Sequence, residues 1–244
     1  MELNKNNDYS SFKINDQKIN LNDQQIKIVK ANIEENMRII ACAGSGKTTT
    51  IICRLKYLID LGIKPEKIIV TTFNVDAAKS MKNKISELFG YMPNIIIGTI
   101  DSISKRFYYK YKIKDNCDFL GVSEYSNKLL EYLESKESKN IKKDYEYIFF
   151  DEFQDINNIQ FQIILNFYKN GSKVILIGDD AQNIYSFRGS NIEYILNLHK
   201  YIDNFVTYKL LFNYRSTPEI INFANNSIKN NKDQIAKKMF PINT

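Results

Sequence analysis

A glycine-rich segment between an apolar run and a helical pattern carries the clearest chemical signal in the 244-residue sequence. Residues 41–48 read ACAGSGKT. The glycines allow backbone N–H groups to close around phosphate oxygens, and a helix N-terminus adds a favourable dipole. We expect Lys47 to reach the β- and γ-phosphates of a nucleotide and Thr48 to hold Mg²⁺ through its hydroxyl. The strict pattern begins with glycine, where this chain has Ala41; the alternative is a glycine-rich turn that ends a strand.

Two adjacent carboxylates follow a second apolar run. Residues 147–152 read YIFFDE, so a buried strand would deliver Asp151 and Glu152 to its C-terminal end. One such acid can hold Mg²⁺, and the other can polarise the water that attacks a phosphate. The alternative is an ordinary strand followed by a helix N-cap, and the phosphate loop upstream favours the catalytic interpretation.

The elements that must position these residues alternate along the chain. Continuous apolar, β-rich runs are typical of strands buried on both faces, and they occur at residues 37–43, 67–73, 94–100, 145–150, 173–178 and 205–212. Helical patterns occur at residues 23–35, 46–60, 75–89, 123–138, 157–168 and 218–228. This order predicts an α/β fold with a mostly parallel sheet flanked by helices, in which ligands bind at the carboxyl ends of the strands.

Composition is that of a soluble globular protein, with 43% hydrophobic and 25% charged residues. No apolar run reaches the roughly 18 residues of a membrane span. The polar N-terminus lacks signal-peptide features, which predicts an intracellular protein, in cytoplasm or nucleus, with no membrane partner. Cys42, Cys53 and Cys117 have no metal-ligand spacing, which argues against a zinc site. The net charge of +6 fits a polyanionic partner only weakly.

Seven segments, in order, resemble the motifs of superfamily 1 helicases of the UvrD/Rep/PcrA type. Residues 151–160, DEFQDINNIQ, are similar to motif II, and residues 178–189, GDDAQNIYSFRG, are similar to motif III. The others are the phosphate loop, the Q motif (21–25), motif Ia (72–81), motif Ib (98–102) and motif IV (213–216, NYRS). The resemblance implies a RecA-like P-loop NTPase that uses ATP and Mg²⁺. An unrelated P-loop phosphotransferase would need neither motif III nor motif IV.

The resemblance also implies a role for each matching position. The implied catalytic residues are Glu152 as general base, Lys47, Gln182 as sensor of the γ-phosphate and Arg215 as arginine finger. The implied metal ligands are Thr48 and Asp151. The implied nucleotide-binding residues are Gln25 at the adenine edge, Tyr214 stacked on the base, and Ala43, Gly44, Ser45, Gly46, Lys47, Thr48 and Thr49. Thr49 stands where close relatives often carry an arginine that covers the adenine, so we expect weaker adenine contacts.

Contacts with single-stranded DNA are implied for residues near motifs Ia, Ib and III, namely Phe73, Thr99, Tyr185, Phe187 and Arg188. Aromatic side chains suit this role because stacking tolerates any base. Core packing is the alternative for the aromatic residues, and a structural ion pair is the alternative for Arg188. The basic-aromatic run at residues 105–114, KRFYYKYKIK, fits nucleic-acid contacts and a solvated helix face equally well.

Motif spacing predicts the domain organisation. We expect a flexible tail at residues 1–20, a RecA-like ATP-binding domain at 21–204 with a reduced helical insertion at about 101–144, and the beginning of a truncated second RecA-like domain at 205–244. The expected function is that of a UvrD-like motor domain, coupling ATP hydrolysis to translocation on single-stranded DNA and duplex unwinding. Its expected partners are single-stranded DNA or 3′-tailed duplex and the missing second motor domain or a partner protein.

The 244-residue chain alone is expected to bind Mg-ATP, hydrolyse it slowly and unwind nothing, because motifs V and VI of the family do not occur in it. The alternative function is a single-lobe regulatory module that binds nucleotide or nucleic acid without motor activity.

Overall fold

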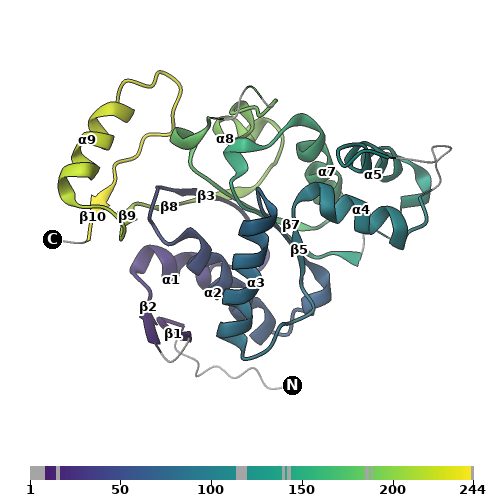
Figure 1. Ribbon diagram of the computed structural model, residues 1–244, viewed down its shortest axis with the longest axis horizontal. Helices are drawn as coiled ribbons and strands as arrows, with labels where there is room; N and C mark the ends of the chain where they lie inside the picture. The colour runs from purple at the N-terminus through teal and green to yellow at the C-terminus, as the bar shows by residue number, and fades with distance from the viewer. Residues whose placement is uncertain are drawn as a thin grey trace.

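A computed structural model of the chain describes residues 9–14, 17–113, 120–138, 141, 144–184, 187 and 189–242. Within these residues, the centre of the molecule is a six-stranded sheet with strand order β5-β4-β6-β7-β3-β8 (Figure 1). All neighbouring strands pair in parallel, which confirms the predicted α/β fold. The strands are β3 (Asn36–Ala41), β4 (Ile68–Thr71), β5 (Ile96–Gly98), β6 (Tyr147–Phe150), β7 (Lys173–Gly178) and β8 (Phe205–Leu210).

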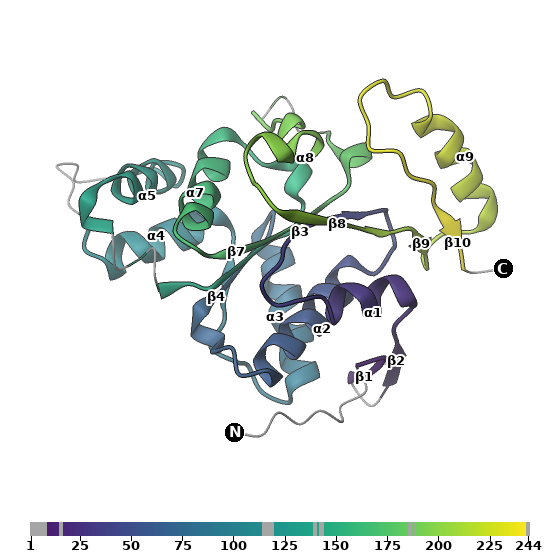
Figure 2. The same ribbon diagram turned by 180° about the vertical axis from the view of Figure 1, so that it is seen from behind.

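Helices cover both faces of the sheet (Figure 1, Figure 2). One face is covered by α1 (Asp23–Val29), α2 (Lys47–Asp60) and α3 (Val75–Phe89), and the other by α4 (Ile100–Lys110), α5 (Glu124–Glu134), α7 (Asn158–Lys169) and α8 (Glu193–Leu196). Successive side chains of a strand point to opposite faces. In β3, Ile39 joins the core under α2, whereas Ile40 joins the core under α7. The inner strands β4 and β6 are buried at every residue, because helices cover both of their faces.

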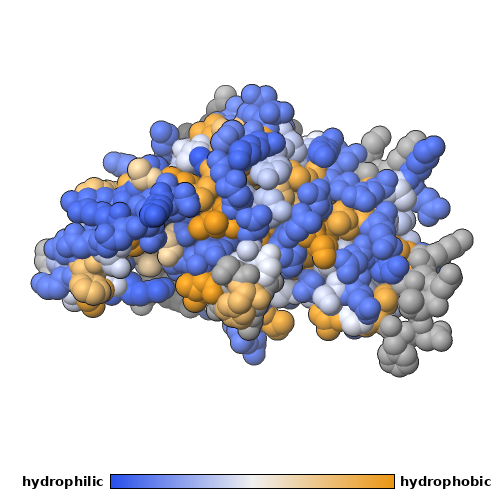
Figure 3. Space-filling model, turned by 90° about the horizontal axis from the view of Figure 1, so that it is seen from above, coloured by the Kyte–Doolittle hydropathy of each residue, from blue (hydrophilic) through white to orange (hydrophobic). Residues whose placement is uncertain are grey.

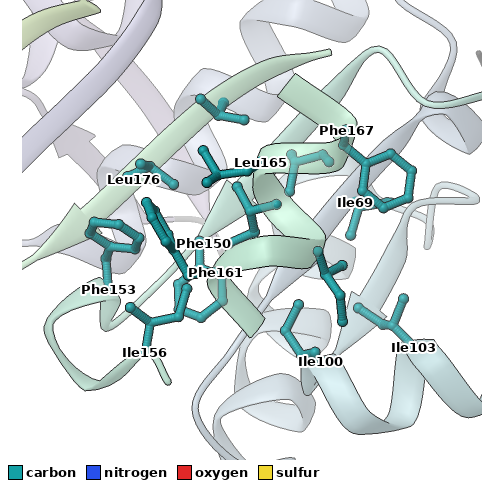
Figure 4. Close-up of a cluster of buried hydrophobic side chains, with 14 of the residues drawn as sticks. Ile69, Ile100, Ile103, Phe150, Phe153, Ile156, Phe161, Leu165, Phe167 and Leu176 are labelled. Carbon is teal, nitrogen blue, oxygen red and sulfur yellow. The ribbon is translucent and has the colours of Figure 1, made fainter. Parts of the chain in front are cut away.

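The core on the α7 side shows how the sheet is sealed (Figure 4). Phe150 of β6 and Leu176 of β7 meet Phe161 and Leu165 of α7, and all four side chains are less than 8% exposed. Burying a side chain of this size stabilises the fold by about 1.5–3 kcal/mol. This packing holds the C-terminal end of β6, where the predicted carboxylates follow, against the rest of the sheet.

Side-chain caps determine where several helices begin. Asn74 caps α3 by accepting a hydrogen bond from Ala77 N, and Asn157 caps α7 in a reciprocal capping box with Gln160. Such caps satisfy N–H groups that the first helical turn leaves unpaired. The caps of α3 and α7 end the loops that carry motifs Ia and II, so they also hold those motifs at the carboxyl edge of the sheet.

The predicted helical insertion is part of the main core rather than a separate appendage. Its described residues form α4 and α5, and Phe107, Leu129 and Leu133 belong to the same cluster as the buried side chains of α7. The described part of the basic-aromatic run lies largely on α4, where Phe107 is buried and Tyr109 is 62% exposed. Lys114, the last residue of that run, lies outside the described residues.

The N-terminal segment departs from the predicted flexible tail. β1 (Ser11–Ile14) and β2 (Gln17–Asn20) pair as antiparallel strands. Phe12 and Ile19 pack on the cluster that contains Val29 of α1 and Cys53 of α2. Four-residue strands are too short to show a recognisable alternation, and their contacts come from helices distant in sequence, so the prediction was wrong for this segment. Residues 1–8 of the predicted tail lie outside the described part of the chain.

The strand at residues 205–210 also requires a correction to the predicted domain boundary. β8 is an edge strand of the main sheet, paired with β3 so that Asn36 lies opposite Phe205 and Ala41 opposite Leu210. A local pattern cannot reveal which sheet a strand joins, because the pairing is between residues far apart in sequence. Beyond β8, the short strands β9 (Phe212–Asn213) and β10 (Phe240–Pro241) pair in parallel, with α9 (Pro218–Ile228) between them along the chain. The assignment of these later residues to a second domain stays a prediction.

The described part of the chain has neither a membrane-spanning helix nor a disulfide bond. Figure 3 shows a face on which hydrophilic side chains predominate, with apolar side chains in small patches among them. Among the described residues, no helix combines the length and the hydropathy needed to cross a membrane. Cys42 and Cys53 are buried free thiols, and burial raises the pKa of each to about 12. Cys117 lies outside the described residues.

Candidate active site

The phosphate loop leaves the C-terminal end of β3 and enters α2 at Lys47. Gly44 and Gly46 have φ angles of +66° and +80°, a left-handed conformation that glycine adopts without strain. A Cβ at Gly44 would lie 2.8 Å from Cβ of Arg215, and a Cβ at Gly46 would lie 2.6 Å from Nε2 of Gln25. The two glycines therefore let motif IV and the Q motif approach the loop closely.

The loop also has hydrogen-bonding capacity that a ligand would use. Ser45 is 2% exposed, and its Oγ has no hydrogen-bond partner among the described residues. Because buried hydroxyls are nearly always paired, this oxygen fits a loop that binds an anion. A cavity of about 510 Å³ opens beside it, within the usual size range of small-molecule sites. The lining residues are Ile19, Asn20, Gln25, Gly44, Ser45, Gly46, Lys47, Thr48, Thr49, Lys84, Glu152, Tyr214 and Arg215.

The two predicted carboxylates stand at the C-terminal end of β6. Nζ of Lys47 lies 2.6 Å from Oε2 of Glu152, which joins the phosphate loop to this strand end. Glu152 has a φ angle of +57°, a strained conformation for a residue other than glycine. Its backbone N–H donates to Oδ1 of Asp151 at 3.0 Å. The turn therefore sends the Glu152 side chain into the cavity while Asp151 stays buried beneath it.

Asp151 has the electrostatics of a cation ligand. Its side chain is buried, and this burial raises the pKa of the carboxyl group to about 6, although the charge of Lys47 lowers it. A divalent cation beside Asp151 would stabilise the ionised form. No cluster of three or more His, Cys, Asp or Glu side chains that could hold a metal exists in the described part of the chain.

Gln25 is held against the phosphate loop at both ends of its amide. Its Oε1 accepts a hydrogen bond from Asn22 N at 3.0 Å, and its Nε2 donates to Ser45 O at 3.4 Å. The first contact belongs to the capping box that begins α1. The side chain lines the cavity, where the predicted adenine contact would form, and its burial to 4% exposure leaves it little freedom to move.

Motif IV closes the other side of the loop. The backbone N–H of Tyr214 donates to Gly44 O at 2.9 Å, and its hydroxyl accepts from Nδ2 of Asn22 at 2.6 Å. Asn213, which the sequence prediction did not assign a role, donates from Nδ2 to Ala43 O at 2.7 Å. The structure thus brings Tyr214 and Arg215 to the cavity predicted for ATP, although they lie more than 160 residues from the loop in sequence.

Motif III reaches the carboxylates through a residue that the sequence did not single out. Nε2 of Gln154 donates to Oε2 of Glu152 at 2.9 Å, and Oε1 of Gln154 accepts from the backbone N–H of Asp179 at 3.0 Å. Gln182 instead donates from Nε2 to Oδ2 of Asp179 at 2.6 Å and does not line the cavity. Its role as sensor of the γ-phosphate stays a prediction. The sequence feature that could have pointed to Gln154 is its position within motif II.

The structure brings only some of the residues predicted to contact nucleic acid to one place. Phe73 and Thr99 line a second cavity of about 320 Å³ that also reaches Asp151 and Glu152. Thr99 caps α4, since its side chain accepts from Ser102 N at 3.2 Å. Phe187 is 76% exposed, so core packing does not explain it. Tyr185 and Arg188 lie outside the described residues.

Two further polar residues line the candidate site, although the sequence prediction gave them no role. Lys84 of α3 lines the nucleotide-sized cavity. Asp155 lines the second cavity, and burial, with a contribution from Glu152, raises the pKa of its carboxyl group to about 6. Perturbed carboxyls concentrate at functional sites, so Asp155 belongs to the candidate site.

The part of the chain that forms the site matches a known protein family. The family model described as "AAA domain" matches residues 24–188, more than half of the chain. The chain belongs to the AAA domain family. The matched part includes the Q-motif residue Gln25, the phosphate loop, the carboxylate pair and Gln182, whereas motif IV follows it.

Relatives of this AAA domain are named as DNA helicases. A protein of Acanthamoeba polyphaga mimivirus, named as an ATP-dependent DNA helicase, is 35% identical over 211 residues, covering 83% of this chain and 30% of the relative. A DNA helicase II homolog of Mycoplasma capricolum is 30% identical over 311 residues, covering 91% of this chain and 43% of the relative. Proteins named DNA helicase II, Rep and PcrA are 26%, 28% and 27% identical. The predicted resemblance to UvrD/Rep/PcrA helicases is confirmed.

The AAA domain chain spans less than half the length of these curated relatives. Among solved structures, the Pif1 helicase from Candida albicans aligns with a TM-score of 0.53 at 16% identity, covering 86% of this chain and 44% of that chain. A likeness at this identity concerns the fold alone, and it agrees with the predicted RecA-like arrangement of sheet and helices.

Proposed function

We propose that this AAA domain binds Mg-ATP beside the phosphate loop and hydrolyses it with Glu152 as the general base. One observation supports this function above the others. The phosphate loop, Glu152 and motif IV line a single cavity, with Nζ of Lys47 placed 2.6 Å from Oε2 of Glu152. A cation for the phosphates and a base for the water thus stand together at the carboxyl edge of a parallel sheet, where ligands bind in such folds.

Each side chain has a distinct part in the proposed reaction. Lys47 and the loop N–H groups hold the phosphates, and Thr48 and Asp151 would hold Mg²⁺, which neutralises charge on the phosphate oxygens when bound. Oε2 of Glu152 accepts hydrogen bonds from Lys47 and Gln154. We therefore assign Oε1 of Glu152 to take the proton of the attacking water. Arg215, which lines the same cavity, would stabilise charge in the transition state.

The names of the relatives extend the proposal to DNA. We propose that the domain is the motor part of a UvrD-like helicase, coupling ATP hydrolysis to translocation on single-stranded DNA and to duplex unwinding with a second motor domain or partner protein. The contact from Glu152 through Gln154 to Asp179 supports such coupling, because it links the proposed base to motif III. Phe187, in the same motif, is 76% exposed, and an exposed aromatic ring suits base stacking.

Lys47→Ala tests the nucleotide site. We expect the affinity for Mg-ATP to fall about tenfold or more, since hydrogen bonds to charged groups contribute about 1.5–3 kcal/mol. Isothermal titration calorimetry measures the change. Lys56→Ala is the matched control, because Lys56 lies in the same helix but pairs with Asp60 at the surface. Equal affinities for Lys47→Ala and the unaltered chain would contradict the site.

Phe187→Ala tests the nucleic-acid surface. We expect the affinity for a single-stranded oligonucleotide to fall by about 1–3 kcal/mol, the usual contribution of one base–aromatic stack. Affinity for Mg-ATP should not change, because Phe187 does not line the nucleotide cavity. Fluorescence anisotropy with a labelled oligonucleotide measures the effect. Phe223→Ala is the control, because Phe223 is 78% exposed on α9 and belongs to none of the motifs. Identical losses in both variants would rule out a specific role for Phe187.

A further inference from the structure

A segment near the C-terminal end of the described chain links motif III to motif IV. We call residues 235–241 the strap. At one end, the backbone N–H of Ile235 donates to Oδ2 of Asp180 at 3.0 Å. At the other end, Phe240 N donates to Leu211 O at 2.9 Å, where β10 pairs with β9. The strap therefore spans the distance between two regions that border the proposed ATP site.

The centre of the strap is anchored by a side-chain amide rather than by a sheet. Met239 is buried beside Cys42 of the phosphate loop and Ile221 of α9. Its backbone N–H donates to Oδ1 of Asn225 at 3.0 Å, and its carbonyl accepts from Nδ2 of Asn225 at 3.0 Å. This pair of hydrogen bonds holds the backbone on both sides of Met239, so the residue two positions earlier has a defined location.

That residue, Lys237, forms the most buried ion-pair group described in the chain. Its side chain is 3% exposed, and its Nζ contacts Oδ1 of Asp179 at 2.9 Å and Oδ1 of Asp180. The side chains of Asp179 and Asp180 are 5% and 1% exposed. Burial lowers the pKa of Lys237, but the two carboxylates outweigh burial and raise it. The ammonium group is thus charged and enclosed between the first two acids of motif III.

Stability alone gives little reason to bury three charges. Buried ion pairs are often replaceable by apolar side chains without loss of stability, whereas they do impose one geometry on their partners. Here the partner is connected further. Oδ2 of Asp179 accepts from Nε2 of Gln182 at 2.6 Å, and the backbone N–H of Asp179 donates to Gln154, which holds Glu152. Asp179 therefore lies between the strap, which its carboxylate contacts, and the proposed catalytic base, which its backbone N–H reaches through Gln154.

We propose that Lys237 is a positioning residue for ATP hydrolysis. It fixes Asp179, whose carboxylate orients Gln182 and whose backbone N–H orients Glu152 through Gln154. This role rests on the proposed function, because it concerns the geometry of the base that this function requires. Since the strap also pairs with motif IV, Lys237 makes the alignment of Glu152 depend on a segment that lies outside every recognised motif.

The test compares Lys237→Met, which removes the charge, with Lys237→Arg, which keeps it. Lys238→Met is the matched control, because the neighbouring Lys238 is exposed over the ring of Phe240. In Lys237→Met, we expect the single-turnover hydrolysis rate at saturating Mg-ATP to fall roughly tenfold or more, the lower end of the range for outer-shell partners at metal sites. The Kd for Mg-ATP should change less than about threefold, because the phosphate contacts remain. Lys237→Arg should recover most of the rate.

A second readout does not require hydrolysis. Side-chain amide signals of Gln154 and Gln182 in ¹H–¹⁵N spectra should shift in Lys237→Met and stay near their original positions in Lys237→Arg and Lys238→Met. If the unaltered chain binds Mg-ATP without hydrolysing it, the proposed catalytic function fails, while the amide signals still decide the role of Lys237. Unchanged amide signals in a folded Lys237→Met variant would overturn the proposal. If Lys237→Met does not fold, Lys237→Arg decides: Gln154 and Gln182 signals and a hydrolysis rate that are both retained, or both altered, support positioning, and a change in only one of the two refutes it.

Discussion

Glu152→Gln should bind Mg-ATP like the unaltered chain and lose about 10²-fold or more of its hydrolysis rate, the usual scale for removing a general base. Glutamine keeps the shape of the side chain and can still accept a hydrogen bond from Lys47, which lies 2.6 Å from Glu152. It cannot take a proton from the attacking water. Phosphate release at saturating Mg-ATP, with and without single-stranded DNA, measures the rate, and calorimetry measures the affinity.

The control for this experiment is Glu131→Gln. Glu131 is an exposed acid on α5 that pairs with Lys128, so its loss should leave the rate unaltered. If Glu152→Gln hydrolyses ATP as fast as the unaltered chain, Glu152 is not the base. If the unaltered chain itself binds Mg-ATP and shows no hydrolysis at all, the regulatory, binding-only module is the better description of this chain.

Arg54→Met should lower the free energy of unfolding by about 2 kcal/mol or more, since it removes the donor to the buried carbonyl oxygens of Val29 and Ala31, and each unsatisfied buried group costs about 1–3 kcal/mol. Arg54 of α2 is 1% exposed. Its guanidinium donates to Val29 O at 2.9 Å, Ala31 O at 2.5 Å and Asn32 O at 3.0 Å, which end the last turn of α1 and the following loop. Methionine fills similar space but donates nothing. Urea denaturation monitored by circular dichroism measures the difference.

Lys56→Met is the control, because it shows how much stability is lost when a surface cation is removed from the same helix, α2. Lys56 forms a surface i,i+4 ion pair with Asp60, and such pairs contribute about 0.3–0.5 kcal/mol. We expect a shift of that order for Lys56→Met. A shift of similar size for both variants would mean that water or a neighbouring group satisfies the carbonyls in place of Arg54. Because α1 carries Gln25, a large loss in Arg54→Met should also weaken ATP binding near the unfolding midpoint.

The parallel sheet and the phosphate-binding edge could be predicted because their signals are local. A strand buried on both faces is largely apolar, as in Ile68–Thr71 and Tyr147–Phe150, and such runs are visible in the sequence. The phosphate loop joins the end of such a strand to a helix, so Lys47 and Glu152 had to meet at one edge once the strands were parallel. Their contact at 2.6 Å agrees with that expectation.

Other parts of the site escaped prediction because their signals are not local. The packing of β1 and β2 and the pairing of β8 with β3 both depend on contacts with segments distant in sequence. Gln154 was part of a recognised motif, yet nothing in the motif says that its two amide atoms reach Glu152 and Asp179. For the stretch around Tyr185 and Arg188, which lies outside the described residues, the implied DNA contacts stay predictions.

The amino-acid sequence by itself determined the class of chemistry. The glycines, Lys47, Asp151 and Glu152 each lie within a few residues of the end of a strand, so the strand that positions each of them is visible in the sequence. Only the tertiary structure decided what surrounds them. Arginine and lysine are usually exposed, yet Arg54 is 1% exposed and the side chain of Lys237 is 3% exposed. The carbonyl oxygens of Val29 and Ala31 accept hydrogen bonds from Arg54. The carboxylates of motif III pair with Lys237. A buried cation is stable only where the fold places acceptors or carboxylates around it. Such partners can be far apart in sequence, as Asp179 and Lys237 are, 58 positions apart in the numbering.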